Sequence, residues 1–211
     1  MKRILIVEDH SIVRLGIVRL LRDLPEPVQI DEVTSGSEAL EKIAVRDYHL
    51  VLLDLSLPGR NGLDLLKQLR RQQPKLPVLV LSMYPEEQYA VRALRGGAAG
   101  YLNKGSAAEE LLTAARKVMQ GGRYITPSQA ELLAEELVDA PLGGPLHRLL
   151  SDRECHFISL LAAGRTMTEI AAELSLSVKT IGTVRNRSLD KLRLHSNAEL
   201  IGYWINNRLD V

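Results

Sequence analysis

Residues 51–62, VLLDLSLPGRNG, place one carboxylate, that of Asp54, at the end of an apolar run. A turn is expected directly afterwards, because the chain continues with Pro58, Gly59, Asn61 and Gly62. An ionised carboxylate in apolar surroundings is costly unless another group pairs with it. Asp54 is therefore either a structural hydrogen-bond acceptor or a group held in place to react, and the sequence on either side has to decide.

Apolar runs like the one before Asp54 recur through the first 120 residues and alternate with helical patterns. The expected strands are Arg3–Val7, Val28–Val33, Leu50–Leu53, Pro77–Leu81 and Ala99–Leu102. The expected helices are Ile12–Arg22, Ser37–Val45, Leu63–Gln72, Glu86–Arg95 and Ala107–Met119. This alternation predicts an α/β fold, a doubly wound five-stranded parallel sheet with helices on both faces. Active groups in such sheets collect at the carboxyl ends of the strands.

The chain changes character after residue 120. A short helix is expected at Ser128–Val138, followed by a linker at Pro141, Gly143, Gly144 and Pro145. The later residues show no strand alternation, and their pattern predicts helices at 152–163, 167–174, 178–192 and 197–208. We expect an α/β domain at 1–120, a linker with a short helix at 121–147, and a small all-α domain at 148–211.

Helix-start signals support the all-α domain. Capping boxes pair a hydroxyl with a glutamate three residues later, and they are expected at Ser151 and Glu154, Thr166 and Glu169, and Ser196 and Glu199. Ser177 is a fourth expected cap, and Gly164 is an expected helix stop. Ser175, Leu176 and Ser177 then separate two short helices by a turn of three residues.

The bulk composition excludes several classes of protein. A chain of 211 residues, of which 45% are hydrophobic, is long enough for two small packed domains. The single cysteine, Cys155, excludes an internal disulfide and a multi-cysteine metal site. No apolar run approaches the roughly 18 residues of a membrane helix, and the N-terminal run is too short for a signal peptide. We therefore expect a soluble cytoplasmic protein without a membrane partner.

Polar side chains stand at the ends of four expected strands. The first strand is followed by Glu8 and Asp9, the third by Asp54, the fourth by Ser82 and the fifth by Lys104. If strand one lies beside strand three, these ends meet at one edge, where three carboxylates need a cation. Oxygen ligands with room for water suit Mg²⁺, which would neutralise the oxygens of an incoming phosphoryl group. Asp54 is the expected nucleophile, while Ser82 and Lys104 are expected to contact phosphoryl oxygens.

Each of these residues alone has a plainer explanation. A single strand-end aspartate is usually a cap or turn acceptor, and Glu8 with Asp9 could simply begin a helix near its positive dipole end. A lone serine means little, and a lone lysine is usually solvated. Together, on the ends of four strands in the right order, the residues favour a reactive site.

Residues 1 to about 120 resemble the receiver domain of bacterial two-component response regulators, which is flavodoxin-like. The resemblance rests on Glu8 and Asp9, on LVLLDLSLPGRNGLDLL, on Ser82 and on GYLNKGS, where Gly105 departs from the proline of many receivers. It implies that a sensor histidine kinase phosphorylates Asp54, with Mg²⁺ held by Glu8, Asp9 and Asp54. Tyr101 matches the aromatic switch position, although an aromatic on a strand is more often plain core.

The short helices 167–174 and 178–192, joined by three residues, form the pattern of a helix-turn-helix. On the second helix, Val178, Ile181, Val184, Leu189 and Leu192 are expected to face inward. The expected DNA-binding residues are Lys179, Thr180, Gly182, Thr183, Asn186, Arg187 and Lys191. Basic side chains suit phosphates, and asparagine and threonine suit base edges. The net charge of +1 does not point to nucleic acid, and a solvated basic face is the alternative.

Residues 148 to 207 resemble the LuxR-type DNA-binding domain of the NarL/FixJ subfamily, through LSDRE, LAAGRTMTEIAAELSLSVKTI and KL. In that family the last helix commonly supplies a dimer contact, for which Leu200, Ile201 and Trp204 are candidates, with core packing as the alternative. Two residues depart from the pattern. Ser188 takes an inward, usually apolar position, where its hydroxyl needs a partner such as the carbonyl of Val184. Gly182 costs helix stability but leaves room for DNA.

The function expected from both parts is that of a response regulator, not an enzyme. Phosphorylation of Asp54 would control dimerisation and sequence-specific binding to double-stranded DNA, with RNA polymerase as a further candidate partner. Two alternatives stay open. One is a Mg²⁺-dependent aspartyl-phosphate phosphatase, which is disfavoured because Ser56 stands where such enzymes carry a second carboxylate. The other is a DNA-binding regulator controlled by protein partners without phosphorylation.

Overall fold

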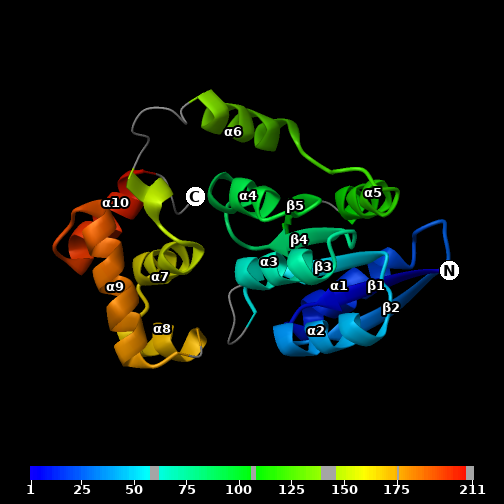
Figure 1. The fold of residues 1–211 in the computed structure, drawn as a ribbon, viewed down its shortest axis with the longest axis horizontal. Helices are drawn as coiled ribbons and strands as arrows, with labels where there is room; N and C mark the ends of the chain where they lie inside the picture. Colours follow the sequence, from blue (N-terminus) through cyan, green and yellow to red (C-terminus); the bar gives the residue numbers. More distant parts are fainter. Residues whose placement is uncertain (58–61, 106–107, 139–145, 175, 208–211) are drawn as a thin grey trace. The chain divides into compact units, whose positions relative to one another are not determined.

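The computed structural model describes residues 1–57, 62–105, 108–138, 146–174 and 176–207, which form two compact units, Met1–Gln129 and Ala130–Val211 (Figure 1). Several sequence predictions fall outside the described residues. They are the turn at Pro58, Gly59 and Asn61, the linker at Pro141, Gly143, Gly144 and Pro145, and Ser175 in the three-residue turn. Among the described residues, no helix has both the length and the apolar character that crossing a membrane requires.

The first unit contains the predicted five-stranded parallel sheet. Its strands are β1 (Lys2–Val7), β2 (Val28–Val33), β3 (Leu50–Asp54), β4 (Val78–Ser82) and β5 (Gly100–Asn103). They lie in the order β2-β1-β3-β4-β5, and all neighbouring pairs are parallel. The order confirms the doubly wound fold and places β1 directly beside β3, at the point where the winding direction reverses.

Five helices cover the two faces of the sheet. They are α1 (Ser11–Leu21), α2 (Gly36–Val45), α3 (Gly62–Gln72), α4 (Glu86–Arg95) and α5 (Ala108–Met119). Successive residues of a strand point to opposite faces, so Leu5 and Val7 of β1 pack with α2, α3 and α4. Ile4 and Ile6 pack on the other face with α1 and α5. Because both faces are covered, the central strand β3 is buried along its whole length, which explains its unbroken apolar run.

The second unit is helical, as predicted. α6 (Pro127–Val138) begins in the first unit, and the second contains a 3₁₀ helix η1 (Leu146–Leu149) and the helices α7 (Asp152–Ala162), α8 (Met167–Glu173), α9 (Val178–Leu192) and α10 (Asn197–Asn206). The helices from α7 onward lie within two residues of the expected bounds, whereas η1 was not expected. Phe157, Ile170, Ile181 and Trp204 are central to their shared core.

The four predicted caps stand at the starts of α7, α8, α9 and α10. Ser151 and Thr166 form complete capping boxes with Glu154 and Glu169, and the Ser177 side chain accepts a hydrogen bond from the Thr180 amide. The third box is incomplete: Ser196 accepts from the Glu199 amide, but the Glu199 carboxylate accepts from the amide of His195, one residue before the cap. Gly164 has a φ of 82°, which confirms it as a helix stop.

A buried histidine makes the stability of the second unit depend on pH. His156 on α7 is 6% exposed, and burial lowers the pKa of its imidazole to about 4. Between about pH 6.5 and pH 4 the unfolded chain therefore binds a proton that the folded chain does not. We expect the free energy of unfolding of this unit to fall by about 3 kcal/mol over that range.

The measurement is urea unfolding of the full chain, followed by the fluorescence of Trp204. This residue is the single tryptophan and lies in the core of the second unit. His156→Gln should remove the acid-dependent loss relative to the wild type, and the exposed His195→Gln should keep it. Parallel pH profiles for the wild type and His156→Gln would show that folding does not lower the pKa of His156.

Candidate functional site

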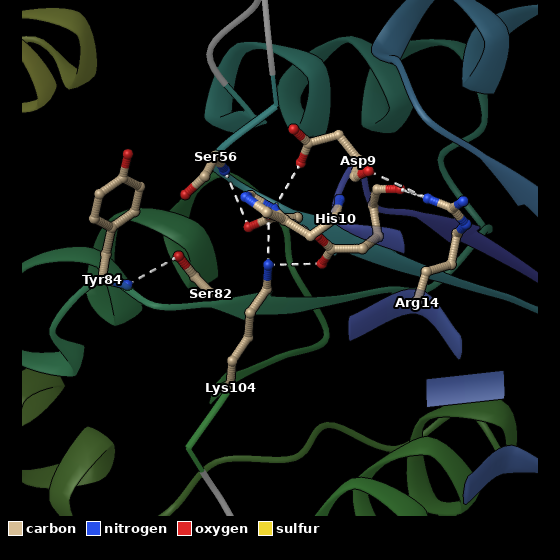
Figure 2. Close-up of polar contacts among 9 residues, drawn as sticks. Asp9, His10, Arg14, Ser56, Ser82, Tyr84 and Lys104 are labelled. Atoms are coloured by element: carbon tan, nitrogen blue, oxygen red, sulfur yellow. Dashed lines mark hydrogen bonds and ion pairs between the residues drawn. The ribbon is translucent and has the colours of Figure 1, made fainter. Parts of the chain in front are cut away.

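The strand ends bring the predicted receiver residues to one edge of the sheet. Asp54 and Ser82 are the last residues of β3 and β4, Glu8 follows β1, and Lys104 follows β5. Pairing of Asp54 with Leu81 sets the register between β3 and β4. Figure 2 shows Lys104 reaching into the cluster, with Ser82 on one side of it. The predicted juxtaposition is thus present.

A buried ion-pair network forms the centre of this site. Lys104 Nζ lies 2.7 Å from Asp54 Oδ2 and 2.6 Å from Glu8 Oε2. Asp54 and Glu8 are each 1% exposed. Burial raises the pKa of Asp54 against the opposing effect of Lys104. Burial lowers the pKa of Lys104, but the neighbouring carboxylates outweigh it and raise that pKa. The ammonium therefore stabilises two carboxylates that would otherwise repel each other.

The same edge can hold a metal ion. Glu8, Asp9, His10 and Asp54 each offer one ligand atom, and these atoms lie within 4.8 Å of one another. Asp9 Oδ1 is buried without a hydrogen-bond partner in the described part of the chain, although His10 Nδ1 lies 3.0 Å away. A carboxylate oxygen left over in this way suits a cation, and three carboxylates suit a hard one such as Mg²⁺.

Two residues of the site were missed by the sequence reasoning. His10 has its Nδ1 3.1 Å from Glu8 Oε1. Arg14 donates from Nη1 to the Glu8 carbonyl at 2.8 Å (Figure 2). It also donates from Nε to Glu32 at 3.0 Å. The spacing of His10 and Arg14 could have indicated the contact with the Glu8 carbonyl. Arg14 lies on α1 one helical turn after His10, the residue that precedes the helix, so its side chain can reach back to the loop after β1.

Hydrogen bonds connect the predicted switch residues to the loop after β4. Ser82 Oγ accepts from the Tyr84 amide at 3.2 Å. The Tyr101 hydroxyl donates to the Tyr84 carbonyl at 2.6 Å, and Tyr101 is completely buried. Burial raises the pKa of Tyr101, so the hydroxyl remains a donor. Beside them, the Ser56 amide donates to Asp54 Oδ1 at 3.0 Å.

In the second unit, α9 has the predicted inward stripe with one correction. Ile181, Val184, Leu189 and Leu192 are buried, but Val178 is 50% exposed because it is the first residue of the helix. Ser188 is fully buried, and its hydroxyl donates to the carbonyl of Val184 at 3.0 Å. That partner is the predicted one.

The outward residues of α9 are not equally free. Lys179, Thr183, Asn186 and Arg187 are exposed. Thr180 and Gly182 are half-buried, and the hydroxyls of Thr180 and Ser177 are 2.7 Å apart. Asn186 accepts from Arg185 at 3.1 Å. Lys191 Nζ lies 2.7 Å from Glu154 of α7, so the basic face is concentrated toward the first three turns of the helix.

The candidate dimer residues on α10 lie mostly inside the unit. Leu200 is fully buried and Trp204 is 1% exposed, while Ile201 is half-buried and packs against the same core. This placement matches the core-packing alternative. Ile205 is a large apolar side chain of α10 that is exposed, at 53%. A dimer contact through Leu200, Ile201 and Trp204 remains a prediction.

Comparison with known proteins gives two family matches. Residues 4–116 match the response regulator receiver domain, and residues 148–204 match the bacterial regulatory proteins of the luxR family. The chain is 35% identical to the response regulator GacA of Pseudomonas viridiflava, covering 95% of this chain and 94% of GacA. It is 32% identical to the response regulator UvrY of Escherichia coli K12, covering 95% and 92%.

Solved structures agree with both matches. RcsB from Salmonella enterica serovar Typhimurium, bound to promoter rprA in the presence of phosphomimetic BeF₃⁻, matches with a TM-score of 0.67 and 27% identity, covering 96% of this chain and 97% of RcsB. The same regulator bound to promoter P1flhDC matches with a TM-score of 0.65 and 29% identity, covering 96% and 97%. These likenesses cover both the α/β unit and the helical unit.

The glycine inside α9 gives a test of the helix surface. A Cβ added at Gly182 would meet nothing within 4 Å, and the same holds for Gly202 on α10. Alanine at either helical position should therefore stabilise the second unit by about 1 kcal/mol, measured by urea unfolding with Trp204 fluorescence. Gly182→Ala alone should also weaken DNA binding if this position approaches DNA. Equal DNA affinity for Gly182→Ala and Gly202→Ala would show that Gly182 does not lie at the DNA interface.

Proposed function

The chain belongs to the response regulators of the NarL/FixJ subfamily, with a receiver domain and a LuxR-type DNA-binding domain, and we propose that phosphorylation of Asp54 controls its binding to DNA. The proposed phosphate donor is a sensor histidine kinase. The observation that carries the proposal is the buried contact of Lys104 with Asp54 and Glu8 at the carboxyl ends of the strands. A lysine on a flexible four-carbon stem can leave a carboxylate oxygen and pair with a phosphoryl oxygen instead, so this contact suits an aspartate that accepts a phosphoryl group.

The proposed chemistry uses residues at the strand ends. An Asp54 carboxylate oxygen attacks phosphorus, and the new O–P bond forms as the P–N bond to the kinase histidine breaks and its imidazole leaves with the electron pair. Mg²⁺ held by Glu8, Asp9 and Asp54 would supply positive charge for the phosphoryl oxygens. Lys104 would turn from the carboxylates to a phosphoryl oxygen, and the Ser82 hydroxyl would donate to another.

The proposed output lies on α9. Lys179 and Arg187 would contact phosphates, and Asn186 and Thr183 would reach base edges in the major groove. The support is the exposed basic face of α9 and the helix-turn-helix order of α8 and α9. Phosphorylation would favour a homodimer that sets two recognition helices about one DNA turn apart. This action on DNA would place the protein in the cytoplasm, with RNA polymerase as a further candidate partner.

Removal of the acceptor tests the proposal. With Mg²⁺ and acetyl phosphate, the wild type should gain one phosphoryl group and bind its DNA about tenfold more tightly. Asp54→Asn should lose both effects, because an amide is not a comparable nucleophile. The measurements are intact mass and fluorescence anisotropy with labelled promoter fragments.

Asp47→Asn is the matched control. Asp47 is exposed and precedes the amino end of β3, so this variant should behave as the wild type does. A phosphorylated wild type whose DNA affinity does not change would favour a regulator controlled by protein partners. A response to acetyl phosphate that persists in Asp54→Asn would show that another residue accepts the phosphoryl group.

A second test addresses the basic face. Arg187→Ala should weaken binding to all DNA sequences and reduce the slope of log affinity against log salt by about 1, because one phosphate contact is lost. Arg22→Ala, an exposed arginine at the end of α1, is the control and should leave the slope unchanged. An unchanged slope in Arg187→Ala would place the phosphate contacts on other residues.

A further inference from the structure

The chain segment after α5 returns to the edge of the receiver sheet. The Tyr124 amide donates to the Ala99 carbonyl at 2.8 Å, and Tyr124 forms a parallel bridge with Gly100 of β5. The approach is close, since a Cβ at Gly100 would lie 2.7 Å from the Tyr124 carbonyl oxygen. We call Tyr124–Gln129 the docking segment. It adds one short backbone pairing beyond the last strand.

Gln129 fixes the end of the docking segment against the switch strand. Its side chain is completely buried. Nε2 donates to the Tyr101 carbonyl at 2.9 Å, and Oε1 accepts from the Thr126 amide at 3.3 Å. A buried amide is tolerated when its donor and acceptor are satisfied. Gln129 therefore depends on the position of Tyr101, and the docking segment depends on Gln129.

A second attachment joins the docking segment to α4. Glu86, in the first turn of α4, accepts from Thr126 Oγ1 and from Ser128 Oγ, both at 2.8 Å. Charge-assisted hydrogen bonds of this kind are stronger than neutral ones. The docking segment is thus held on one side by β5 and on the other by α4.

Three hydrogen bonds, joined through the covalent structure of Tyr84 and Tyr101, lead from the reactive edge to the docking segment. Ser82 Oγ accepts from the Tyr84 amide, the Tyr84 carbonyl accepts from the Tyr101 hydroxyl, and the Tyr101 carbonyl accepts from Gln129. Glu86 lies two residues beyond Tyr84, so the loop after β4 reaches the docking segment by a second route. Both routes begin next to Ser82.

We propose that the docking segment is a state-dependent clamp on the receiver, that Gln129 is the positioning residue that closes it, and that phosphorylation opens it. This inference rests on the proposed function, because the opening signal is the phosphoryl group on Asp54. When Ser82 turns to that group, the loop of Tyr84 and Glu86 moves, and the contacts of Tyr101 and Glu86 with the segment weaken. The released segment frees the start of α6, which leads to the DNA-binding unit.

The closed clamp is tested first without any phosphate donor. The readout is hydrogen exchange at the Tyr124 amide in the full chain, followed by NMR, because this amide bonds to Ala99 and not to Gln129. Gln129→Met keeps the size of the side chain but removes both hydrogen bonds, and it should speed exchange at least tenfold. Gln120→Met, at an exposed position of the same residue type, is the control. Unchanged exchange in Gln129→Met would overturn the clamp.

A second variant guards against misfolding of the first. Thr126→Val removes the hydroxyl that bonds Glu86 and should also speed exchange at Tyr124, while amides of β3 keep their protection. Loss of protection throughout β3 in Gln129→Met would show unfolding, and the outcome would then be decided by Thr126→Val. Wild-type exchange at Tyr124 in Thr126→Val would overturn the clamp in that case.

Phosphorylation supplies the second arm of the test. With acetyl phosphate and Mg²⁺, exchange at Tyr124 in the wild type should rise toward the rate of Gln129→Met. By reciprocity, Gln129→Met should bind the phosphoryl mimic BeF₃⁻, in the presence of Mg²⁺, several-fold more tightly than the wild type does. If the wild type is phosphorylated and its DNA binding tightens while Tyr124 exchange is unchanged, the coupling is overturned and the proposed function stands. If the wild type is not phosphorylated, the proposed function and the coupling are both overturned. The closed clamp is then judged by hydrogen exchange at Tyr124 without a phosphate donor.

Discussion

The contact of one lysine ammonium with two buried carboxylates is the constraint on which the receiver depends. Lys104, Asp54 and Glu8 lie at the ends of three different strands, and the lysine pairs with both carboxylates. These charges are tolerated at almost complete burial because they pair with one another. The pairing requires β1, β3 and β5 to end at the same level. The strand order, the register and the two apolar cores that fix the sheet therefore all determine the position of these three side chains. A shift of one residue in β3 would turn Asp54 to the opposite face of the sheet.

The sequence was most informative where one side chain's environment follows from its neighbours along the chain. The unbroken apolar run before Asp54 predicted a strand buried on both faces, and hydroxyl–glutamate spacing predicted the helix starts at Ser151 and Thr166. The partner of Ser188 was predictable because it lies one helical turn away. Contacts between distant segments were less accessible. The strand ends could be brought together only because parallel topology places them at one edge, whereas the pairing of Lys191 with Glu154 had no local signal.

The failures have physical reasons as well. Val178 was expected inside from its periodicity, but the first residue of a helix has no preceding turn to cover it. The Glu199 carboxylate accepts from the Ser196 hydroxyl but from the His195 amide in place of the Ser196 amide, because a flexible carboxylate can reach either of two neighbouring amides. Gln129 drew no attention in the sequence, since a glutamine near a helix start is ordinary. Its importance comes from Tyr101, 28 residues earlier, and such a contact is set by tertiary packing.

The bridge between Tyr124 and Gly100 has a consequence for solubility. A parallel sheet with open ends presents unpaired amides and carbonyls along its outer strands, and such edges are templates for aggregation. On the β5 side this edge is partly capped by the chain itself, through the Tyr124 amide on the Ala99 carbonyl. A receiver fragment cut after α5 would lose that cap. The boundary of a well-behaved isolated receiver therefore lies beyond Gln129, although the residues of its candidate site end at Lys104.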